Sequence, residues 1–96
     1  MRKLGQAETI LTGSWIYEDK TMSGDAICER IKWLIEKHFQ KIKDSPTSGC
    51  WEILYRDPDD GRYWERTYPQ GEMHGGGPPQ LRFLTDHEAK DKYGLP

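Results

Sequence analysis

Residues 25–43 read DAICERIKWLIEKHFQKIK, and this stretch decides the fold of the chain. One set of its residues recurs at the i, i+4, i+7 spacing of a single buried helix stripe. The stripe consists of Ile27, Ile31, Leu34, Ile35, His38 and Ile42. Acidic residues near the start and lysines near the end suit the helix dipole. The pattern predicts one long helix from about Asp25 to Lys43, stopped by the sequence DSPTSG at residues 44–49.

The segment before this helix is rich in β-branched and aromatic residues. Residues 9–17, TILTGSWIY, predict a first strand, in which Gly13 marks a bulge or a close backbone approach. Residues 18–24 are polar and predict a connection. Ser23 or Asp25 can cap the helix that follows.

The segment after the helix predicts a hairpin. WEILYR at residues 51–56 and YWERTY at residues 63–68 predict paired strands around the turn DPDDG at residues 57–61. Because side chains alternate along a strand, Trp51 shares one face with Ile53 and Tyr55. We expect this face to pack against the helix stripe.

The C-terminal third predicts one more strand and a short helix. Residues 81–84 form the strand, and Thr85 with Glu88 forms a capping box. The helix ends near Tyr93, with Gly94 as its C-cap. The sequence therefore predicts an α+β fold over residues 1–96 as a single domain: a small antiparallel sheet with one long helix packed on a face and a short C-terminal helix.

Composition limits the classes of partner. Four Trp, five Tyr and two Phe among 96 residues supply a small core of large side chains, although 31% of the chain is charged. The formal net charge of -2 gives no support to nucleic-acid or membrane-surface binding, since both rely on excess positive charge. We therefore expect no nucleic-acid partner and no membrane partner.

The N-terminal residues and the cysteines indicate a cytoplasmic location. MRKLGQAE at residues 1–8 lacks the apolar run of a secretory signal, and the apolar runs elsewhere are too short to span a bilayer. Cys28 and Cys50 are the two cysteines, which fits a reducing compartment better than a disulfide framework. The ligand spacings of a preformed zinc site are missing, so we expect no metal and no cofactor.

Two features invite a functional reading. Trp33 lies opposite the helix stripe, where it is either a protein-binding anchor or covered by a loop or the N-terminus. His74 precedes Gly75, Gly76 and Gly77, but a strand rather than a helix follows, which disfavours a phosphate loop. The glycines instead permit close approach of another backbone, within the domain or on a partner.

The acidic turn has a similar pair of readings. Asp57, Asp59 and Asp60 lack the regular spacing and distal Glu of a calcium loop, and turn chemistry explains them. As an exposed tip, Asp59 and Asp60 could face a basic partner. Since no local signature brings a nucleophile and a base together, we predict no catalytic residues and no enzyme activity.

Five segments carry a resemblance to a known family. They are LTGSW (11–15), CERIKWL (28–34), WEILYRDPDDGRYWE (51–65), YPQGEMHGGGPP (68–79) and AKDKY (89–93). In this order they resemble the immunity protein 27 family, whose members are small bacterial proteins of polymorphic toxin systems. The resemblance implies a cytoplasmic antidote that binds a cognate toxin from neighbouring cells and blocks it by occlusion, without catalytic residues.

We expect such a protein to be a monomer when free. The predicted partner surface comprises the loop 69–79, the turn 57–61 and the outward side of the sheet. Its predicted residues are Asp59, Asp60, His74, Gly75, Gly76, Gly77 and Trp33. Two alternatives remain: an adaptor that binds a protein or peptide through its sheet edge, and a small hydrolase that uses His74.

Overall fold

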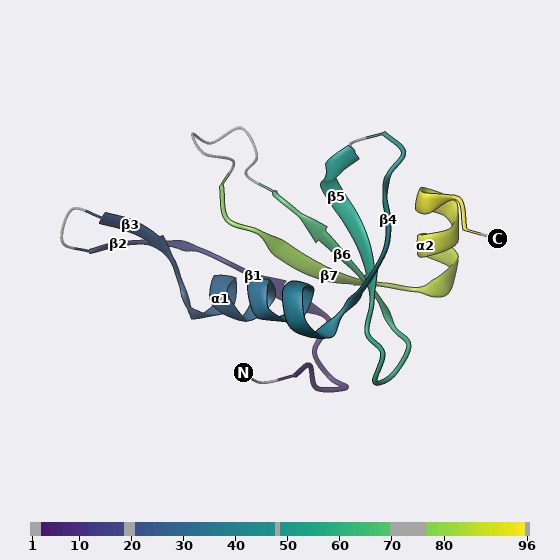
Figure 1. The fold of residues 1–96 in the computed structure, drawn as a ribbon, viewed down its shortest axis with the longest axis horizontal. Helices are drawn as coiled ribbons and strands as arrows, with labels where there is room; N and C mark the ends of the chain where they lie inside the picture. The colour runs from purple at the N-terminus through teal and green to yellow at the C-terminus, as the bar shows by residue number, and fades with distance from the viewer. Residues whose placement is uncertain (1–2, 19–20, 48, 70–76, 96) are drawn as a thin grey trace.

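An antiparallel sheet and a projecting hairpin make up the architecture (Figure 1). The structure, a computed structural model, describes residues 3–18, 21–47, 49–69 and 77–95. The strands are β1 (Ile10–Thr12), β2 (Trp15–Glu18), β3 (Thr21–Gly24), β4 (Gln40–Ser45), β5 (Gly49–Arg56), β6 (Tyr63–Thr67) and β7 (Gln80–Leu84). The helices are α1 (Ala26–Trp33), the π-helical turn η1 (Leu34–His38) and α2 (Asp86–Tyr93).

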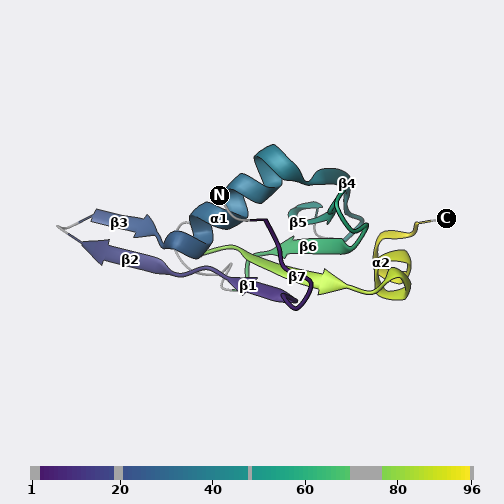
Figure 2. The ribbon, with the colours of Figure 1, turned by 90° about the horizontal axis from the view of Figure 1, so that it is seen from below.

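Five of the strands form one sheet in the order β1-β7-β6-β5-β4, and every pairing is antiparallel. Strands β2 and β3 form a separate two-stranded sheet. Figure 2 shows α1 along one face of the five-stranded sheet and α2 at the far end from the hairpin. The predicted α+β fold, with a longer helix on a sheet face and a short C-terminal helix, is confirmed.

Two apolar clusters lie on opposite faces of the sheet. The main cluster joins α1 and η1 to the sheet and consists of Leu11, Ile31, Leu34, Phe39, Ile53, Tyr55, Trp64 and Leu81. The second cluster holds α2 and consists of Leu54, Leu84, Ala89 and Tyr93. Strand alternation explains this division, because neighbouring residues of β5 point to opposite faces.

The long helix ends earlier than the sequence predicts. Its last turn is π-helical, with the Phe39 N–H bonded to the Leu34 carbonyl at 2.6 Å, and Phe39 is extended. The predicted helical residues 40–43 instead begin β4, which pairs with β5. Ile42 sits four residues after His38 and so fits a helix locally, but the hydrogen bonds of the sheet edge outweigh that local preference.

A second correction concerns residues 9–24. The single predicted strand is divided into β1 and β2, and the predicted polar connection contains β3. Gly13 lies at the division, where its N–H donates to the Pro79 carbonyl at 2.9 Å. A Cβ at Gly13 would lie 2.5 Å from the Cys28 sulfur, so the predicted close approach is confirmed.

Trp51 is the third correction. It was expected to pack against the helix stripe, as Ile53 and Tyr55 do, but 53% of Trp51 is exposed. The helix ends at His38, beside Asp57 at the opposite end of β5. The part of the sheet face at Trp51 is therefore left uncovered by α1.

The helix caps agree with the sequence. Asp25 caps α1 by accepting from the Cys28 N–H at 2.8 Å, and Thr85 and Glu88 form the capping box of α2. Gly94, with φ 66°, ends α2 in the left-handed conformation. Cys28 is a buried free thiol. Across the described residues, no helix has both the length and the apolar character needed to cross a membrane.

Candidate protein-binding surface

The acidic turn forms as predicted, but its first carboxylate is structural. The Asp57 side chain is buried and accepts from the Asp59 N–H at 2.9 Å. His38 Nε2 lies 3.1 Å from Asp57 Oδ1 and 3.4 Å from Asp59 Oδ2. Because a buried carboxylate needs such partners, this turn ties the end of η1 to the end of β5.

Asp59 and Asp60 also have ionic partners within the chain. Asp60 Oδ2 accepts from Arg62 Nε at 2.6 Å, and Lys3 Nζ lies 3.6 Å from Asp59 Oδ2. Partial burial raises the pKa of Asp60, but hydrogen bonds and charge from Arg62 outweigh it and leave that pKa lowered. The negative charge of the tip is thus largely balanced internally, and its predicted role in partner binding stays a prediction.

The same turn contains the group of possible metal ligands that is found among the described residues. Ligand atoms of His38, Asp57 and Asp59 all lie within 4.8 Å of one another. The interactions with His38, Lys3 and the turn backbone already account for both carboxylates. We therefore assign no metal to this cluster.

Trp33 is partly buried rather than fully exposed. Its ring stacks on His38 with centroids 5.9 Å apart and an interplanar angle of 11°. Trp33 also packs against the main cluster, as does Leu4 of the N-terminal segment. The structure therefore favours the reading in which Trp33 is covered, and its part in partner binding stays a prediction.

The glycine-rich loop is described only at its end. The predicted residues His74, Gly75 and Gly76 lie outside the described residues. Gly77 is buried with φ 69°, in the left-handed region that favours glycine. It leads directly into the segment that contacts Gly13 through the Pro79 carbonyl.

Trp51, which the sequence pattern places in the core, instead lies on an exposed surface of the sheet. The Trp51 and Tyr68 rings meet edge to face, with centroids 5.6 Å apart, and the Arg66 guanidinium lies 4.8 Å from the centre of the Tyr68 ring. These two rings border a cleft of about 650 Å³, here called the sheet cleft. It is lined by Trp51, Glu52, Glu65, Thr67, Tyr68, Pro69, Gln80, Arg82 and Lys92. Strand alternation alone could not find it, because exposure of Trp51 depends on which part of β5 the helix covers.

A buried carboxylate fixes the floor of the sheet cleft. Glu65 accepts from the Tyr93 hydroxyl at 2.8 Å and pairs with Lys92 at 2.6 Å and Arg82 at 3.2 Å. Burial raises the pKa of Glu65, but the bonds from Lys92, Tyr93 and Arg82 outweigh it and lower that pKa. Lys92 also reaches Glu52 at 3.0 Å, so the network links β5, β6, β7 and α2.

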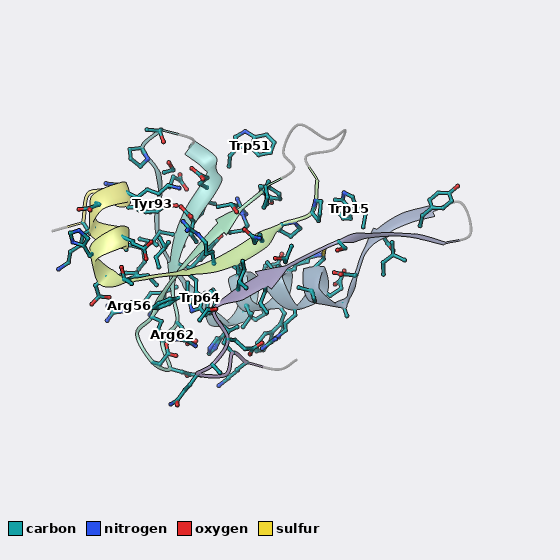
Figure 3. All side chains as sticks on the ribbon, turned by 180° about the vertical axis from the view of Figure 1, so that it is seen from behind. Trp15, Trp51, Arg56, Arg62, Trp64 and Tyr93 are labelled. Atoms are coloured by element: carbon teal, nitrogen blue, oxygen red, sulfur yellow. The ribbon has the colours of Figure 1, made fainter. Side chains whose placement is uncertain are left out.

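The β2–β3 hairpin, here called the arm, carries a second exposed apolar surface. Figure 3 labels Trp15, the first residue of β2. Trp15, Ile16 and Tyr17 are all exposed, and Tyr17 reaches 68%. A groove of about 340 Å³ at the base of the arm, here called the arm groove, is lined by Trp15, Gly24, Cys28, Glu29, Ile31, Lys32, Ile35, Glu36, Arg66, Tyr68 and Pro79. Tyr68 borders both hollows, so the two surfaces adjoin.

The comparison with protein families settles the membership of the chain. The model of immunity protein 27 matches residues 17–85, which is more than half of the sequence. The chain belongs to the immunity protein 27 family. The resemblance seen in the sequence is thereby confirmed, and the match includes Trp51, Tyr68 and the acidic turn. No curated protein and no solved structure matches the chain.

Proposed function

We propose that this immunity protein binds a cognate toxin and neutralises it by occlusion, that is, by covering the surface of the toxin that acts on its target. Family membership supports an immunity role, and the exposed pair Trp51–Tyr68 is the observation that carries the binding proposal. Aromatic anchors beside a hollow are typical of the residues that dominate protein–protein affinity. Trp51 is 53% exposed in a chain whose other large rings mostly serve the core.

The surroundings of Trp51 suit a rigid recognition surface. The ring stands on β5, an interior strand of the five-stranded sheet, and the Glu65 network holds the neighbouring strands and α2 in place. Preorganised anchors bind more tightly because little side-chain or loop ordering is required on association. The cleft is lined by both cations and carboxylates, which allows a partner's charges to set the docking orientation.

Occlusion requires no reactive group in the inhibitor, so we assign no catalytic residue and no cofactor. The residues predicted from the sequence also remain part of the proposal as contacts of the toxin, namely Asp59, Asp60, His74, Gly75, Gly76, Gly77 and Trp33. We further propose that the protein acts in the cytoplasm, as a free monomer until a toxin delivered from a neighbouring cell is bound.

The proposal is tested with the product of the gene beside this one. Co-expression should restore growth that the neighbouring product alone prevents, and the two purified proteins should form a stable complex. Trp51→Ala should weaken the complex by about 2 kcal/mol or more, as expected for a central aromatic anchor. Ile10→Ala is the matched control, since Ile10 is 52% exposed on β1 and truncation there should leave affinity unchanged. Absence of both rescue and complex formation would refute the proposed function.

A further inference from the structure

Both edges of the arm lack a neighbouring strand in the described part of the chain. Strands β2 and β3 pair only with each other there, over four residue pairs from Trp15 with Gly24 to Glu18 with Thr21. The arm extends beyond α1 in both views of the ribbon (Figures 1 and 2). An isolated two-stranded ribbon is marginally stable by itself, so additional pairing along either edge stabilises it.

The ladder of the arm shows which backbone groups are directed outward. Asp25 donates its N–H to the Ser14 carbonyl at 2.9 Å, which makes Ser14 a residue bonded towards the second strand. Antiparallel ladders alternate, so Ile16 is the next residue bonded inward. The N–H and C=O groups of Trp15 and Tyr17 therefore point to the outer edge of β2, where they are available to a further strand.

This edge differs from the edge of the main sheet. Strand β4 carries Lys41 and Lys43, and its register with β5 shifts twice. Charges and bulges are the usual devices that prevent unwanted pairing at a sheet edge. Strand β2 instead presents the consecutive exposed residues Trp15, Ile16 and Tyr17. The β4 edge of the main sheet is thus protected against added strands, whereas the β2 edge of the arm has the features of an edge that accepts one.

We propose that the outer edge of β2 accepts an extended strand of the cognate toxin, which becomes the third strand of the arm sheet. The inference rests on the proposed function and names the docking edge for that partner. Main-chain hydrogen bonds to Trp15 and Tyr17 supply affinity, and alternate side chains of the added strand supply specificity. An apolar side chain of the toxin beside Trp15 enters the arm groove.

The size and position of the surface favour a toxin over a second copy of this chain. The described apolar side chains of the arm expose roughly 300 Å² together, if a whole aromatic side chain offers about 150–250 Å². A stable interface buries about 800 Å² on each partner. Two arms paired antiparallel about a two-fold axis would hold the two bodies at opposite ends, and burial would be limited to the arms.

A toxin is free of that restriction. Its strand can lie along β2 while its body covers the arm groove, the Tyr68 ring and the adjoining sheet cleft. The arm thereby extends the surface around Trp51 into one continuous interface. Because Tyr68 connects the two surfaces, we assign the β2 edge to the same toxin that binds at Trp51.

The experiment compares two isoleucines of nearly equal exposure on two strand edges. Ile16 on β2 is 37% exposed and Ile42 on β4 is 38% exposed. Affinity for the purified product of the neighbouring gene is measured by calorimetry for Ile16→Lys and Ile42→Lys. Ile16→Lys should weaken binding about tenfold or more, because a lysine on an edge strand disfavours pairing with an added strand. Ile42→Lys should change the affinity less than about threefold.

A second pair of variants tests the main-chain contact. Tyr17→Pro removes the outward N–H while sparing the inward ladder, and Tyr17→Ala keeps the N–H but removes the ring. Tyr17→Pro should bind about tenfold more weakly than Tyr17→Ala. Circular dichroism and thermal unfolding report whether each variant folds. If Tyr17→Pro does not fold, the affinity of Ile16→Lys alone tests whether the toxin binds this edge.

The outcomes separate the two proposals. If the neighbouring product binds the wild type and both lysine variants equally, the arm proposal is wrong and the proposed function stands. If it does not bind or rescue at all, the proposed function fails, and with it the inference. If light scattering shows that the free wild type is a dimer that Ile16→Lys dissociates, the edge belongs to a second copy and the toxin-strand proposal is overturned.

Discussion

Replacing Tyr93 with phenylalanine should remove one buried hydrogen bond and little else. Tyr93 is fully buried, and its hydroxyl donates to Glu65 Oε2 at 2.8 Å. A hydrogen bond to a charged group contributes about 1.5–3 kcal/mol to stability. Glu65 keeps Lys92 at 2.6 Å after the substitution. We therefore expect the free energy of unfolding to fall by about 1.5 kcal/mol, near the lower limit of that range.

The pH dependence of this loss follows from the direction of the pKa shift. The pKa of Glu65 lies below its ordinary value of 4.5, because bonds from Lys92 and Tyr93 outweigh the effect of burial. A carboxyl with a depressed folded pKa contributes stability above its unfolded pKa, and that stability is lost as the pH falls through the folded pKa. Removing the Tyr93 donor brings the folded pKa closer to the unfolded one. The difference in the free energy of unfolding between wild type and Tyr93→Phe should therefore become smaller below about pH 4.5.

Urea unfolding at a series of pH values from neutral downward measures both effects. The control is Tyr63→Phe, since Tyr63 is a partly buried tyrosine of the same cluster whose hydroxyl has no hydrogen bond to any described residue. Its substitution should change stability by less than about 0.5 kcal/mol. A loss for Tyr93→Phe as small as that of the control, or one that stays constant through the acid range, would refute the reasoning about Glu65.

Four further substitutions test the packing and the backbone conformation. Trp51→Ala should cost less than about 1.5 kcal/mol in urea unfolding, because the exposed ring has mainly its edge-to-face contact to lose, whereas Leu34→Ala in the main cluster should cost about 2–5 kcal/mol. Gly13→Ala should lower the thermal midpoint and cost about 1–3 kcal/mol, since the new Cβ would lie 2.9 Å from the Pro79 carbonyl oxygen. Gly77→Ala should also cost about 1–2 kcal/mol in thermal unfolding, because a φ of 69° is strained for a residue with a Cβ.

The features that could be predicted from the sequence are those fixed by neighbouring residues. The capping box at Thr85 and Glu88 satisfies backbone groups within one turn, so its pattern is sufficient. The hairpin of β5 and β6 depends on a turn whose residue types require it. The helix over Ile31 and Leu34 depends on the residues of the stripe that lie within α1 and η1.

The features that could not be predicted depend on distant partners. Ile42 continues the helical spacing, and only pairing of β4 with β5 places it in a strand. Trp51 is exposed because η1 ends beside Asp57, at the other end of β5, so strand alternation alone does not decide whether Trp51 is buried. Residues 21–24, TMSG, form β3 because β2 is beside them, not because of their own propensity.

Charge in this protein is used mainly to hold the molecule together, and this bears on how it recognises a partner. Asp57 meets His38, Asp60 meets Arg62, and Glu65 meets Lys92, each at 3.1 Å or less. Charges satisfied within the fold gain little from a partner, because each new contact replaces an existing one. The exposed rings differ, because the part of each ring that is still exposed gains free energy when a partner removes it from water. In the proposed complex, apolar anchoring at Trp51 and strand addition along the arm therefore supply affinity, while the balanced charges around them determine which toxin fits.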